Sequence, residues 1–428
     1  MLSESISILG PMPDKQNLLE ELDWRGLLQQ HTEGLGQALA AGRVSAYCGF
    51  DPTASSLHVG SLLPVMMLMR LQQAGHRPFV VVGGGTGMIG DPSGKTAERQ
   101  LNTLDVVEAN SRGLRAQLEK FLDFSGANAA QMRDNGDWLR QLKAIDFMRD
   151  VGKHFTLNYM LAKESVQMRM DSGISYTEFS YMLLQAYDYR ELFLRDRVTL
   201  QVGGSDQWGN ITAGLELIRR TEGGDAHALT FPLVTNSSGT KFGKTESGNV
   251  WLDPERTSPY QFYQFWINVD DRDAPRYLRF FTLLSRQAIM DFEKDIAERP
   301  QERAAQRALA REMTARVHGD EAARIAEDVS GLLFGKTDPA SLSPSALQAL
   351  TREVPFALVD SFTSVADGLV ALGLVSSKGA ARRLIEQGGA SINGRRVSVS
   401  DPVGEPLGGK YFLFRKGARD YGLLEVRS

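Results

Sequence analysis

Residues able to bind an anion gather where the chain passes from a strand to a helix near residue 50. A strand-like run ends at Phe50, Thr53 follows, and a helix-like run begins at His58. An imidazole and a hydroxyl at the start of a helix face unpaired backbone N–H groups and the positive end of the helix dipole, which together favour an anion. Gly60 lacks a side chain, so a flat ring could lie against the backbone there. A lone histidine in such a place is more often a structural hydrogen-bonding group, and both interpretations stay open.

Three polar-tipped side chains form one stripe on a helix-like segment that is otherwise apolar. Tyr181, Gln185 and Asp188 stand at positions i, i+4 and i+7, which places them within roughly 60° of one another at 3.6 residues per turn. An ordinary amphipathic helix turns such a stripe to water. Here the other faces are apolar too, so we expect the helix to be buried. An unpaired buried polar group costs about 1–3 kcal/mol, and a pocket with a polar ligand would supply partners.

Glycine-rich segments resemble nucleotide-binding motifs without matching them. Residues 85–90 satisfy G-x-G-x-x-G after a strand-like run, but this fingerprint must open a helix and residues 91–94, Asp-Pro-Ser-Gly, would break one. A hydride-transfer enzyme is therefore disfavoured. Residues 90–96 and 239–245 each lack one residue of the P-loop spacing. Both still combine glycine, lysine and hydroxyl groups, which suits a polyphosphate, although a solvated surface turn has the same composition.

The elements that must position these residues alternate between strands and helices. Apolar strand-like runs at Val44–Phe50, Phe79–Val82 and Val198–Val202 are separated by helical patterns, and periodicity predicts a further helix over residues 15–41. This alternation predicts an α/β fold with a parallel sheet. Ligands bind beyond the carboxyl ends of such strands, so we expect the chemistry in the segments after Phe50, Val82 and Val202.

The second half of the chain predicts different architecture. We expect residues 1–235 to form the α/β domain and residues 236–334 to form a helical domain. Residues 335–355 predict a linker, because they begin with Gly, Pro and Ser in the run GKTDPASLSPS. Residues 356–428 predict a small α+β domain with ten basic and seven acidic residues, a net of +3.

Composition excludes several classes of protein. The 428 residues are 42% hydrophobic and 23% charged, which is typical of globular domains, and the net charge of -4 excludes a generally basic nucleic-acid coat. The single cysteine, Cys48, cannot form an internal disulfide or a cysteine-ligated zinc site, and no cluster has metal-ligand spacing, so we expect no protein metal site. The first fourteen residues carry acidic and no basic side chains, so we expect no secretory leader, and no apolar run reaches membrane length. We expect a cytoplasmic protein.

Five blocks occur in order along the chain: YCGFDPTASSLHVG, GDPSGKTAER, YTEFSYMLLQAYD, VGGSDQWGN and KFGKTESGNVWLD. Together they resemble the class I aminoacyl-tRNA synthetases, specifically the bacterial type of tyrosyl-tRNA synthetase. Residues 52–61 are similar to the family's HIGH region, and residues 241–245 are similar to its KMSKS loop. The second histidine of HIGH is Ser61 here, so the role of that imidazole does not carry over.

The resemblance implies a ligase of protein biosynthesis with a Rossmann-like catalytic domain. It would form tyrosyl-adenylate from L-tyrosine and ATP and then transfer tyrosine to the 3' end of tRNA(Tyr). Tyr47 and Asp188 would bind the phenolic hydroxyl of the substrate. The ammonium would be held by Tyr181, Gln185 and Asp91, and Gln207 would lie near the carboxylate.

The resemblance also implies the nucleotide contacts. The ATP site would comprise Cys48, Asp51, His58, Gly60, Gly204, Asp206 and Lys244, with Cys48 and Asp206 at the ribose, although Cys48 as a plain buried thiol is an equal alternative. The phosphates would be stabilised by Thr53, His58, Lys95, Arg99, Lys241, Lys244 and Thr245. Tyrosine's carboxylate is already ionised at pH 7, so no general base is needed. Mg²⁺ would arrive with ATP, held chiefly by its phosphates.

The tail domain carries a second resemblance, to the α-L type of RNA-binding motif, in residues 376–398, SSKGAARRLIEQGGASINGRRVS. One predicted helix and one Asn-Gly turn would present a cationic surface to tRNA phosphates, through Lys378, Arg382, Arg383, Arg395 and Arg396. Arginine pairs in isolation more often form a solvated charged face. The position of these residues on a small net-positive domain favours RNA.

The family further implies a homodimer with an interface around residues 140–180 that includes Tyr176. Two alternatives stay open. A tryptophan-specific relative could use Asp188 to accept from an indole N–H. An RNA-binding paralogue without catalysis is disfavoured by the presence of His58, Lys244, Asp188 and Gln185, although Ser61 leaves that interpretation open.

Overall fold

The computed structural model describes residues 18–93, 101–170, 173–237, 239, 242–245 and 248–427. The chain divides into two compact units, one formed by Met1–Asp253 and Val269–Ala305 and the other by Pro254–Asn268 and Gln306–Ser428. This division differs from the boundary predicted at residue 235. The helices of residues 269–305 pack with the first unit, where the buried guanidinium of Arg70 donates to the carbonyls of Phe280 and Thr282 at 2.9 and 2.8 Å.

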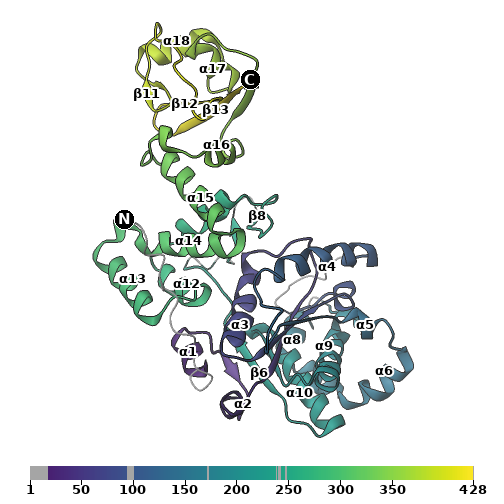
Figure 1. Ribbon diagram of the computed structural model, residues 1–428. Coiled ribbons are helices and arrows are strands. Elements are labelled where there is room, and N and C mark those ends of the chain that lie inside the picture. The colour runs from purple at the N-terminus through teal and green to yellow at the C-terminus, as the bar shows by residue number, and fades with distance from the viewer. Residues whose placement is uncertain are drawn as a thin grey trace. The chain divides into compact units, whose positions relative to one another are not determined.

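A six-stranded sheet forms the centre of the first unit (Figure 1). Its order is β1-β6-β5-β2-β3-β4, and all neighbours are parallel except β1 and β6. The strands are β1 (Gln30–His31), β2 (Ser45–Phe50), β3 (Arg77–Val82), β4 (Gln131–Asp134), β5 (Leu200–Gly204) and β6 (His227–Phe231). The chain proceeds from β2 toward β4 in one direction and from β5 toward β6 in the other. The switch point between β2 and β5 is where a ligand is expected in such a sheet.

The first unit also contains α-helices. They are α1 (Leu18–Trp24), α2 (Leu35–Ala41), α3 (Leu62–Gln73), α4 (Leu104–Leu118), α5 (Gly136–Leu139), α6 (Ala144–Asp150), α7 (Leu157–Leu161), α8 (Glu164–Met170), α9 (Tyr176–Asp196), α10 (Trp208–Glu222), α12 (Ala274–Phe281) and α13 (Arg286–Glu298). A short hairpin of β7 (Lys244–Thr245) and β8 (Gly248–Asn249) completes the unit. Figure 1 shows α9 and α10 side by side against the sheet.

The core of the first unit explains why the sheet forms. Alternate residues of β2 and β3, namely Tyr47, Phe79 and Val81, share one buried cluster with Tyr189 and Leu192 of α9. Successive side chains of a strand point to opposite faces, and both faces of these strands are covered, because five of the six residues of β3 are buried. This is why the strands appear in the sequence as continuous apolar runs.

The predicted helix over residues 15–41 is instead two short helices, α1 and α2, with β1 between them. The apolar periodicity passes through two glycines that the backbone uses for turns. Gly26 and Gly34 have φ values of 72° and 80°, in the left-handed region that ends helices and favours glycine.

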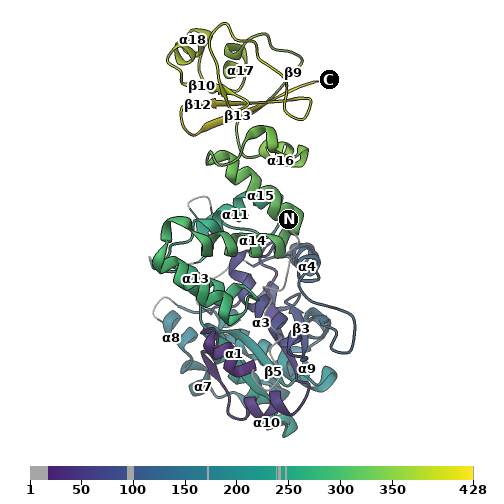
Figure 2. The same ribbon diagram turned by 60° about the vertical axis from the view of Figure 1, so that its left-hand side comes forward.

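The second unit combines a helical part with a five-stranded sheet (Figure 2). Its helices are α11 (Pro259–Ile267), α14 (Ala304–His318), α15 (Asp320–Leu333), α16 (Pro344–Leu350), α17 (Val365–Ala371) and α18 (Lys378–Glu386). The strands are β9 (Phe356–Val359), β10 (Ala390–Ile392), β11 (Arg395–Arg396), β12 (Tyr411–Lys416) and β13 (Asp420–Val426), in the order β11-β10-β12-β13-β9. The predicted α+β character of residues 356–428 is confirmed.

Both faces of this second sheet are covered. Phe412 and Phe414 face α17 and α18, whereas the alternate residues Tyr411 and Leu413 pack against α15 and α16. Figure 2 shows α17 and α18 on one side of the sheet and α16 on the other.

The segment 335–355, predicted as a linker, contains the packed helix α16. Leu347 and Leu350 of this helix are 1% and 0% exposed. The loop-like composition arises from helix caps, because Ser343 caps α16 and Pro344 occupies its first turn. Ser and Pro are favoured at helix starts as well as in loops, so composition alone could not separate the two.

Candidate active site

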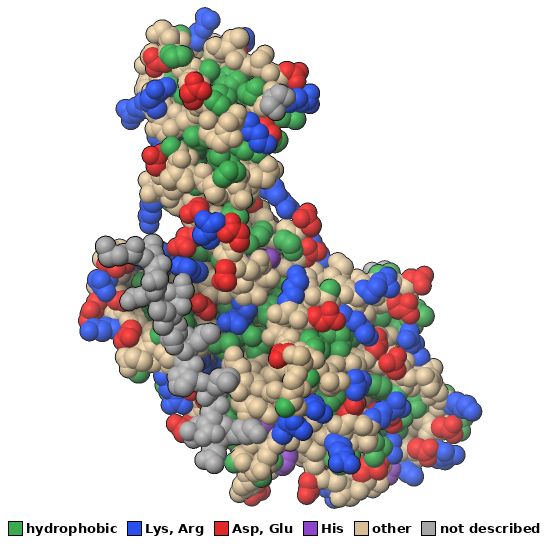
Figure 3. Space-filling model, viewed as in Figure 1, with side chains coloured by type: hydrophobic (Ala, Val, Ile, Leu, Met, Phe, Trp, Pro, Cys, Tyr) green, Lys and Arg blue, Asp and Glu red, His purple; other side chains and the backbone are tan. Residues whose placement is uncertain are grey.

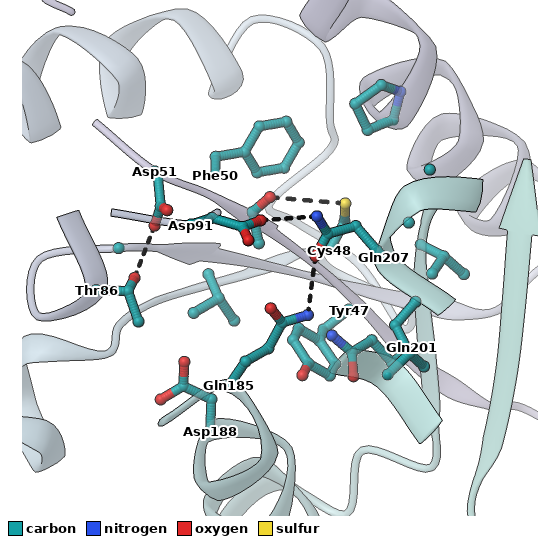
Figure 4. A pocket seen from close by; sticks show the side chains of 18 of the residues that line it. Tyr47, Cys48, Phe50, Asp51, Thr86, Asp91, Gln185, Asp188, Gln201 and Gln207 are labelled. Carbon is teal, nitrogen blue, oxygen red and sulfur yellow. Dashed lines mark hydrogen bonds between the residues drawn. The ribbon is translucent and has the colours of Figure 1, made fainter. Parts of the chain in front are cut away.

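A cavity of about 290 Å³ opens at the carboxyl ends of β2 and β5 (Figure 4). Its wall is built from the end of β2, the turn after β3, one side of α9 and the end of β5. Its polar lining includes Tyr47, Asp51, Thr86, Asp91, Asn135, Tyr181, Gln185, Asp188, Gln201 and Gln207. The location is the topological switch point of the sheet, as expected from the strand pattern.

The polar stripe of α9 faces this cavity. Tyr181, Gln185 and Asp188 all line it, and α9 buries most of its remaining surface, as its apolar sides predict. Each of the three has polar partners in the wall. Gln185 donates to Gln207 at 3.3 Å, and Tyr181 donates its phenolic proton to Asp51 at 2.9 Å.

Asp188 is held rigidly by two residues that the sequence did not suggest. Asn135 donates to its Oδ2 at 2.8 Å, and the indole of Trp138 donates to its Oδ1 at 2.7 Å. Burial raises the pKa of Asp188 to about 8, although these two hydrogen bonds act in the opposite direction. The Asn135 amide is itself fixed, because its Oδ1 accepts from the backbone N–H of Gly85 at 2.8 Å. The carboxylate therefore has one orientation.

Two buried polar atoms at the cavity have no hydrogen-bond partner among the described residues. They are the hydroxyl of Tyr47 and Oε1 of Gln201, whose side chains lie on β2 and β5 and are 2% and 3% exposed. Burial raises the pKa of Tyr47 well above its usual range, so its hydroxyl keeps its proton. Since unpaired buried polar groups are rare, these atoms indicate a polar ligand. The sequence pattern did not indicate Gln201, because this residue stands inside an apolar strand.

The cavity wall is acidic. Asp51, Asp91 and Asp188 line it, and no Lys, Arg or His belongs to its described lining. Asp91 accepts from Gln207 at 2.7 Å, and Asp51 accepts from Thr86 at 2.7 Å (Figure 4). Asp51, predicted for the nucleotide, thus shares its carboxylate with the hydroxyls of Thr86 and Tyr181. The carboxyl groups of Asp51 and Asp91 favour a ligand with a cationic group, whereas burial raises the pKa of Asp188 and thereby favours its neutral form.

His58 caps the short 3-10 turn Val59–Ser61. Its Nδ1 accepts from the backbone N–H of Gly60 at 3.0 Å, so the neutral ring carries its proton on Nε2 and can donate there. Gly60 lines the cavity, and a Cβ at this position would lie 2.7 Å from His58 Cε1. Thr53 is exposed and Ser61 is half-buried, and neither lines the cavity.

The predicted ribose contacts come from two elements, Cys48 from β2 and Asp206 from the turn after β5. Cys48 and Gly204 line the cavity, and burial raises the pKa of Cys48 to about 12, so the thiol stays protonated. A Cβ on Gly204 would lie 2.7 Å from Asp206 Oδ1. The close approach of the nucleotide to this glycine stays a prediction.

The two signature segments, far apart in sequence, meet in the structure. The backbone N–H of Val59 donates to the carbonyl of Val250 at 2.9 Å, and that of Leu252 donates to Leu57 at 2.9 Å. The hairpin that contains the backbone of Lys244 and Thr245 is thereby joined to the segment that carries His58. Lys95, Arg99 and Lys241 lie outside the described residues, and so do the side chains of Lys244 and Thr245.

The basic residues predicted for RNA lie on the second unit. Arg382 and Arg383 are exposed on α18, and Arg395 and Arg396 are exposed on β11. Within the described part of the chain these four form no ion pair, whereas Lys378 pairs with Asp367 at 2.5 Å. Figure 3 shows acidic and basic side chains interspersed over the visible face, in agreement with the absence of a general basic coat.

Among the described residues, no group of three or more His, Cys, Asp or Glu side chains could hold a metal ion. No helix in that part of the chain is long and apolar enough to span a membrane.

Comparisons with known proteins cover nearly the whole chain. The family model for tRNA synthetases class I (W and Y) matches residues 39–335, and that for the Tyrosine--tRNA ligase SYY-like C-terminal domain matches residues 346–424. A Tyrosine--tRNA ligase of Anaeromyxobacter dehalogenans is 53% identical over 96% of this chain and 100% of its own length. One of Geobacillus stearothermophilus is 51% identical over 95% and 99%.

Solved structures agree with the fold. The C-terminally truncated mitochondrial tyrosyl-tRNA synthetase of Aspergillus nidulans is 30% identical with a TM-score of 0.67, over 74% of this chain and 94% of its own. A tryptophanyl-tRNA synthetase of Encephalitozoon cuniculi has a TM-score of 0.53 at 13% identity, over 73% and 91%. At that identity the second likeness shows the fold alone.

Proposed function

Because this chain belongs to the class I tRNA synthetases of the tryptophan and tyrosine group, we propose that it is a tyrosine–tRNA ligase whose cavity binds L-tyrosine beside ATP. One observation carries the choice of tyrosine. The cavity combines a rigidly held carboxylate, Asp188, with the buried and unpartnered hydroxyl of Tyr47. A phenolic hydroxyl can accept from Tyr47 while it donates to Asp188, whereas an indole N–H can only donate.

The acidic wall orients the other end of the substrate. The ammonium of tyrosine lies near Asp91, Tyr181 and Gln185, and Asp51 adds a further carboxylate to this side. Gln207, which is held by Asp91, lies near the substrate carboxylate. Phenylalanine would fill the same volume but leave Tyr47 unpartnered, so it gains less on binding.

The first step transfers the adenylyl group of ATP to the tyrosine carboxylate. The carboxylate oxygen attacks the α-phosphorus, the bond to the β-phosphate oxygen breaks, and pyrophosphate leaves. Charge gathers on phosphate oxygens, so the chain contributes positioning and electrostatic stabilisation. We assign this role to Thr53, His58, Lys95, Arg99, Lys241, Lys244 and Thr245, with Cys48, Gly60, Gly204 and Asp206 at the nucleoside. Mg²⁺ enters with the substrate ATP, bound chiefly by its phosphates.

In the second step a hydroxyl oxygen at the 3' end of tRNA(Tyr) attacks the carbonyl carbon of the tyrosyl-adenylate. An ester bond forms, the bond from that carbon to the phosphate oxygen breaks, and AMP leaves while the hydroxyl proton is lost. We assign tRNA docking to the C-terminal part of the second unit, through Arg382, Arg383, Arg395 and Arg396, which are exposed and without an ion pair in the described chain. Lys378 contributes less, because it is engaged with Asp367. The enzyme acts in the cytoplasm, where its three substrates meet.

The functional enzyme is a homodimer. The stretch from residue 140 to 180 exposes an unusual number of large apolar side chains: Ile145, Met148, Leu157, Met168, Met170 and Tyr176. Ile145 and Tyr176 are 73% and 74% exposed, and large exposed apolar surface usually marks an interface. Sedimentation of Tyr176→Glu should show a shift toward monomer, whereas Met290→Glu, at an exposed methionine of α13, should sediment as wild type. Equal sedimentation of all three proteins would contradict this interface.

Pyrophosphate exchange into ATP tests the proposed activity. The assay is run separately with tyrosine, tryptophan and phenylalanine. We expect exchange with tyrosine alone. Exchange with tryptophan instead would identify the tryptophan-specific relative, and no exchange with any of the three would identify a paralogue without catalysis.

A further inference from the structure

The ring of Phe242 packs on two aromatic side chains of α12, Tyr277 and Phe281. Phe242 lies between the two lysines of the predicted nucleotide loop. Its ring stacks on Phe281 with centroids 5.1 Å apart and an interplanar angle of 14°, and it meets the edge of Tyr277 at 5.0 Å. Tyr277 and Phe281 stand four residues apart, on one face of α12, and are 2% and 0% exposed. Such aromatic pairs stabilise a fixed geometry beyond their buried area.

The same helix also holds the segment that leads into the loop. The backbone N–H of Ser237 donates to Oδ2 of Asp273, directly before α12, at 2.8 Å. The hydroxyl of Tyr277 donates to the carbonyl of Thr235 at 3.1 Å, and Arg276 donates to the same carbonyl. α12 therefore fixes the chain both before the loop and at Phe242.

α12 is in turn fixed to the helix that follows His58. Arg70 of α3 is 2% exposed and donates to the carbonyls of Arg279, Phe280 and Thr282 at 3.2, 2.9 and 2.8 Å. Arg25 donates to the carbonyl of Leu284 at 2.7 Å. Cations at the last carbonyls of a helix are favourable, because they complement its dipole. The helix that carries Tyr277 and Phe281 is thus anchored to α3 through Arg70.

The residue after Phe242 completes the connection. Gly243 has φ of 80°, and a Cβ there would lie 2.5 Å from Cγ2 of Val59, in the turn capped by His58. Its carbonyl accepts from the backbone N–H of Val250 at 3.1 Å. Phe242 and Gly243 therefore place the loop backbone against α12 on one side and against the His58 turn on the other.

We propose that Phe242 is a positioning residue for adenylate formation: its seat on Tyr277 and Phe281 sets the loop backbone from which the neighbouring lysines reach the phosphates. This inference rests on the proposed function. Phe242 itself contacts no reacting atom. Its contribution belongs to the step in which charge gathers on phosphate oxygens, and not to the binding of tyrosine, whose cavity it does not line.

The test compares Phe242→Leu, which removes the ring, with Phe242→Tyr, which keeps it. Phe280→Leu is the matched control, because Phe280 is a buried aromatic of the same helix whose ring meets the edge of Phe281 at a centroid distance of 6.4 Å, whereas Phe242 stacks on Phe281 at 5.1 Å. Single-turnover adenylate formation, equilibrium tyrosine binding and thermal unfolding are measured for each. From the loss of two aromatic pairs we expect Phe242→Leu to slow adenylate formation about tenfold. Tyrosine affinity should stay within about twofold of wild type, and Phe242→Tyr should restore the rate.

A double-mutant cycle with Lys244→Ala separates positioning from a merely structural role. If Phe242 acts through the loop lysines, Phe242→Leu should have little further effect once Lys244 is removed. Fully additive rate losses would overturn the proposal, and so would an equal loss in Phe280→Leu or an unchanged rate in Phe242→Leu. None of these outcomes contradicts the ligase function if the wild-type protein catalyses pyrophosphate exchange into ATP in the presence of tyrosine. A wild type without that exchange would overturn the proposed function and this proposal with it.

Discussion

Replacement of Tyr47 by phenylalanine should have opposite effects on stability and on tyrosine binding. The ring of Tyr47 packs edge-on to Tyr189 at 5.2 Å and is buried with Phe79 and Val81, and phenylalanine preserves this packing. Only the hydroxyl is lost, and in the free protein that hydroxyl has no partner among the described residues.

The magnitudes follow from this difference. An unpaired buried hydroxyl costs about 1–3 kcal/mol, so Tyr47→Phe should leave the free energy of unfolding unchanged or raise it by about 1 kcal/mol. In the complex, one hydrogen bond to the phenolic oxygen is lost, about 0.5–1.5 kcal/mol, which is roughly a 2- to 12-fold weaker affinity for tyrosine. Phenylalanine offers no oxygen, so its affinity should not change and the preference for tyrosine should fall by the same factor.

Tyr189→Phe is the matched control. Tyr189 belongs to the same cluster, but its hydroxyl donates to the carbonyl of His227 at 2.7 Å. Its removal should lower the free energy of unfolding by about 1 kcal/mol and leave tyrosine affinity unchanged. Urea unfolding without ligand and calorimetric titration with tyrosine and phenylalanine measure both quantities. If Tyr47→Phe behaved like Tyr189→Phe, the cavity would not read the phenolic hydroxyl through Tyr47.

Four further predictions concern the loop, the pH dependence of binding, the pH dependence of stability, and RNA. In Gly243→Ala the new side chain must adopt a left-handed backbone conformation, which costs about 1–2 kcal/mol, and it points toward Val59. Single-turnover adenylate formation should therefore fall at least about fivefold, with tyrosine affinity unchanged. A wild-type rate would contradict the close approach of Gly243 to Val59. Burial raises the pKa of Asp188 to about 8, whereas a phenolic donor favours the ionised carboxylate. Tyrosine affinity measured by titration should therefore rise from pH 6 toward pH 8 and then level off. A flat or falling profile would argue against a phenolic donor at Asp188. The same raised pKa makes the ligand-free fold lose stability between about pH 4 and pH 8, since the unfolded carboxyl ionises first. Charge reversal at residues 382–383 should weaken tRNA charging in an aminoacylation assay and leave pyrophosphate exchange intact. Equal losses in both assays would refute a separate docking surface. Substitution is preferable to truncation, because α16 and the C-terminal sheet share one core.

Buried parallel strands were the most predictable part of the fold. β2, β3 and β5 appear in the sequence as apolar runs because they are covered on both faces. β4, Gln131–Asp134, is half-buried throughout and mostly polar, so no hydrophobic pattern predicted a strand there. Asn135 follows this strand directly, and its contact with Asp188 could therefore not be predicted either.

Contacts between distant segments account for the remaining differences. The helical character expected for residues 236–334 follows from local periodicity, yet which core each helix joins depends on partners such as Arg70, far away in sequence. The stripe of Tyr181, Gln185 and Asp188 was predictable because helical periodicity is local. That Trp138 fixes Asp188, or that Gly243 rests on Val59, depends on tertiary packing that no local pattern encodes.

The decisive experiment is a crystal structure of the complex with L-tyrosine. We expect the phenolic oxygen to lie within about 3 Å of both the Tyr47 hydroxyl and the Asp188 carboxylate, with the ammonium toward Asp91 and Tyr181. A substrate bound in the reverse direction, or one whose phenolic oxygen contacts neither Tyr47 nor Asp188, would contradict it.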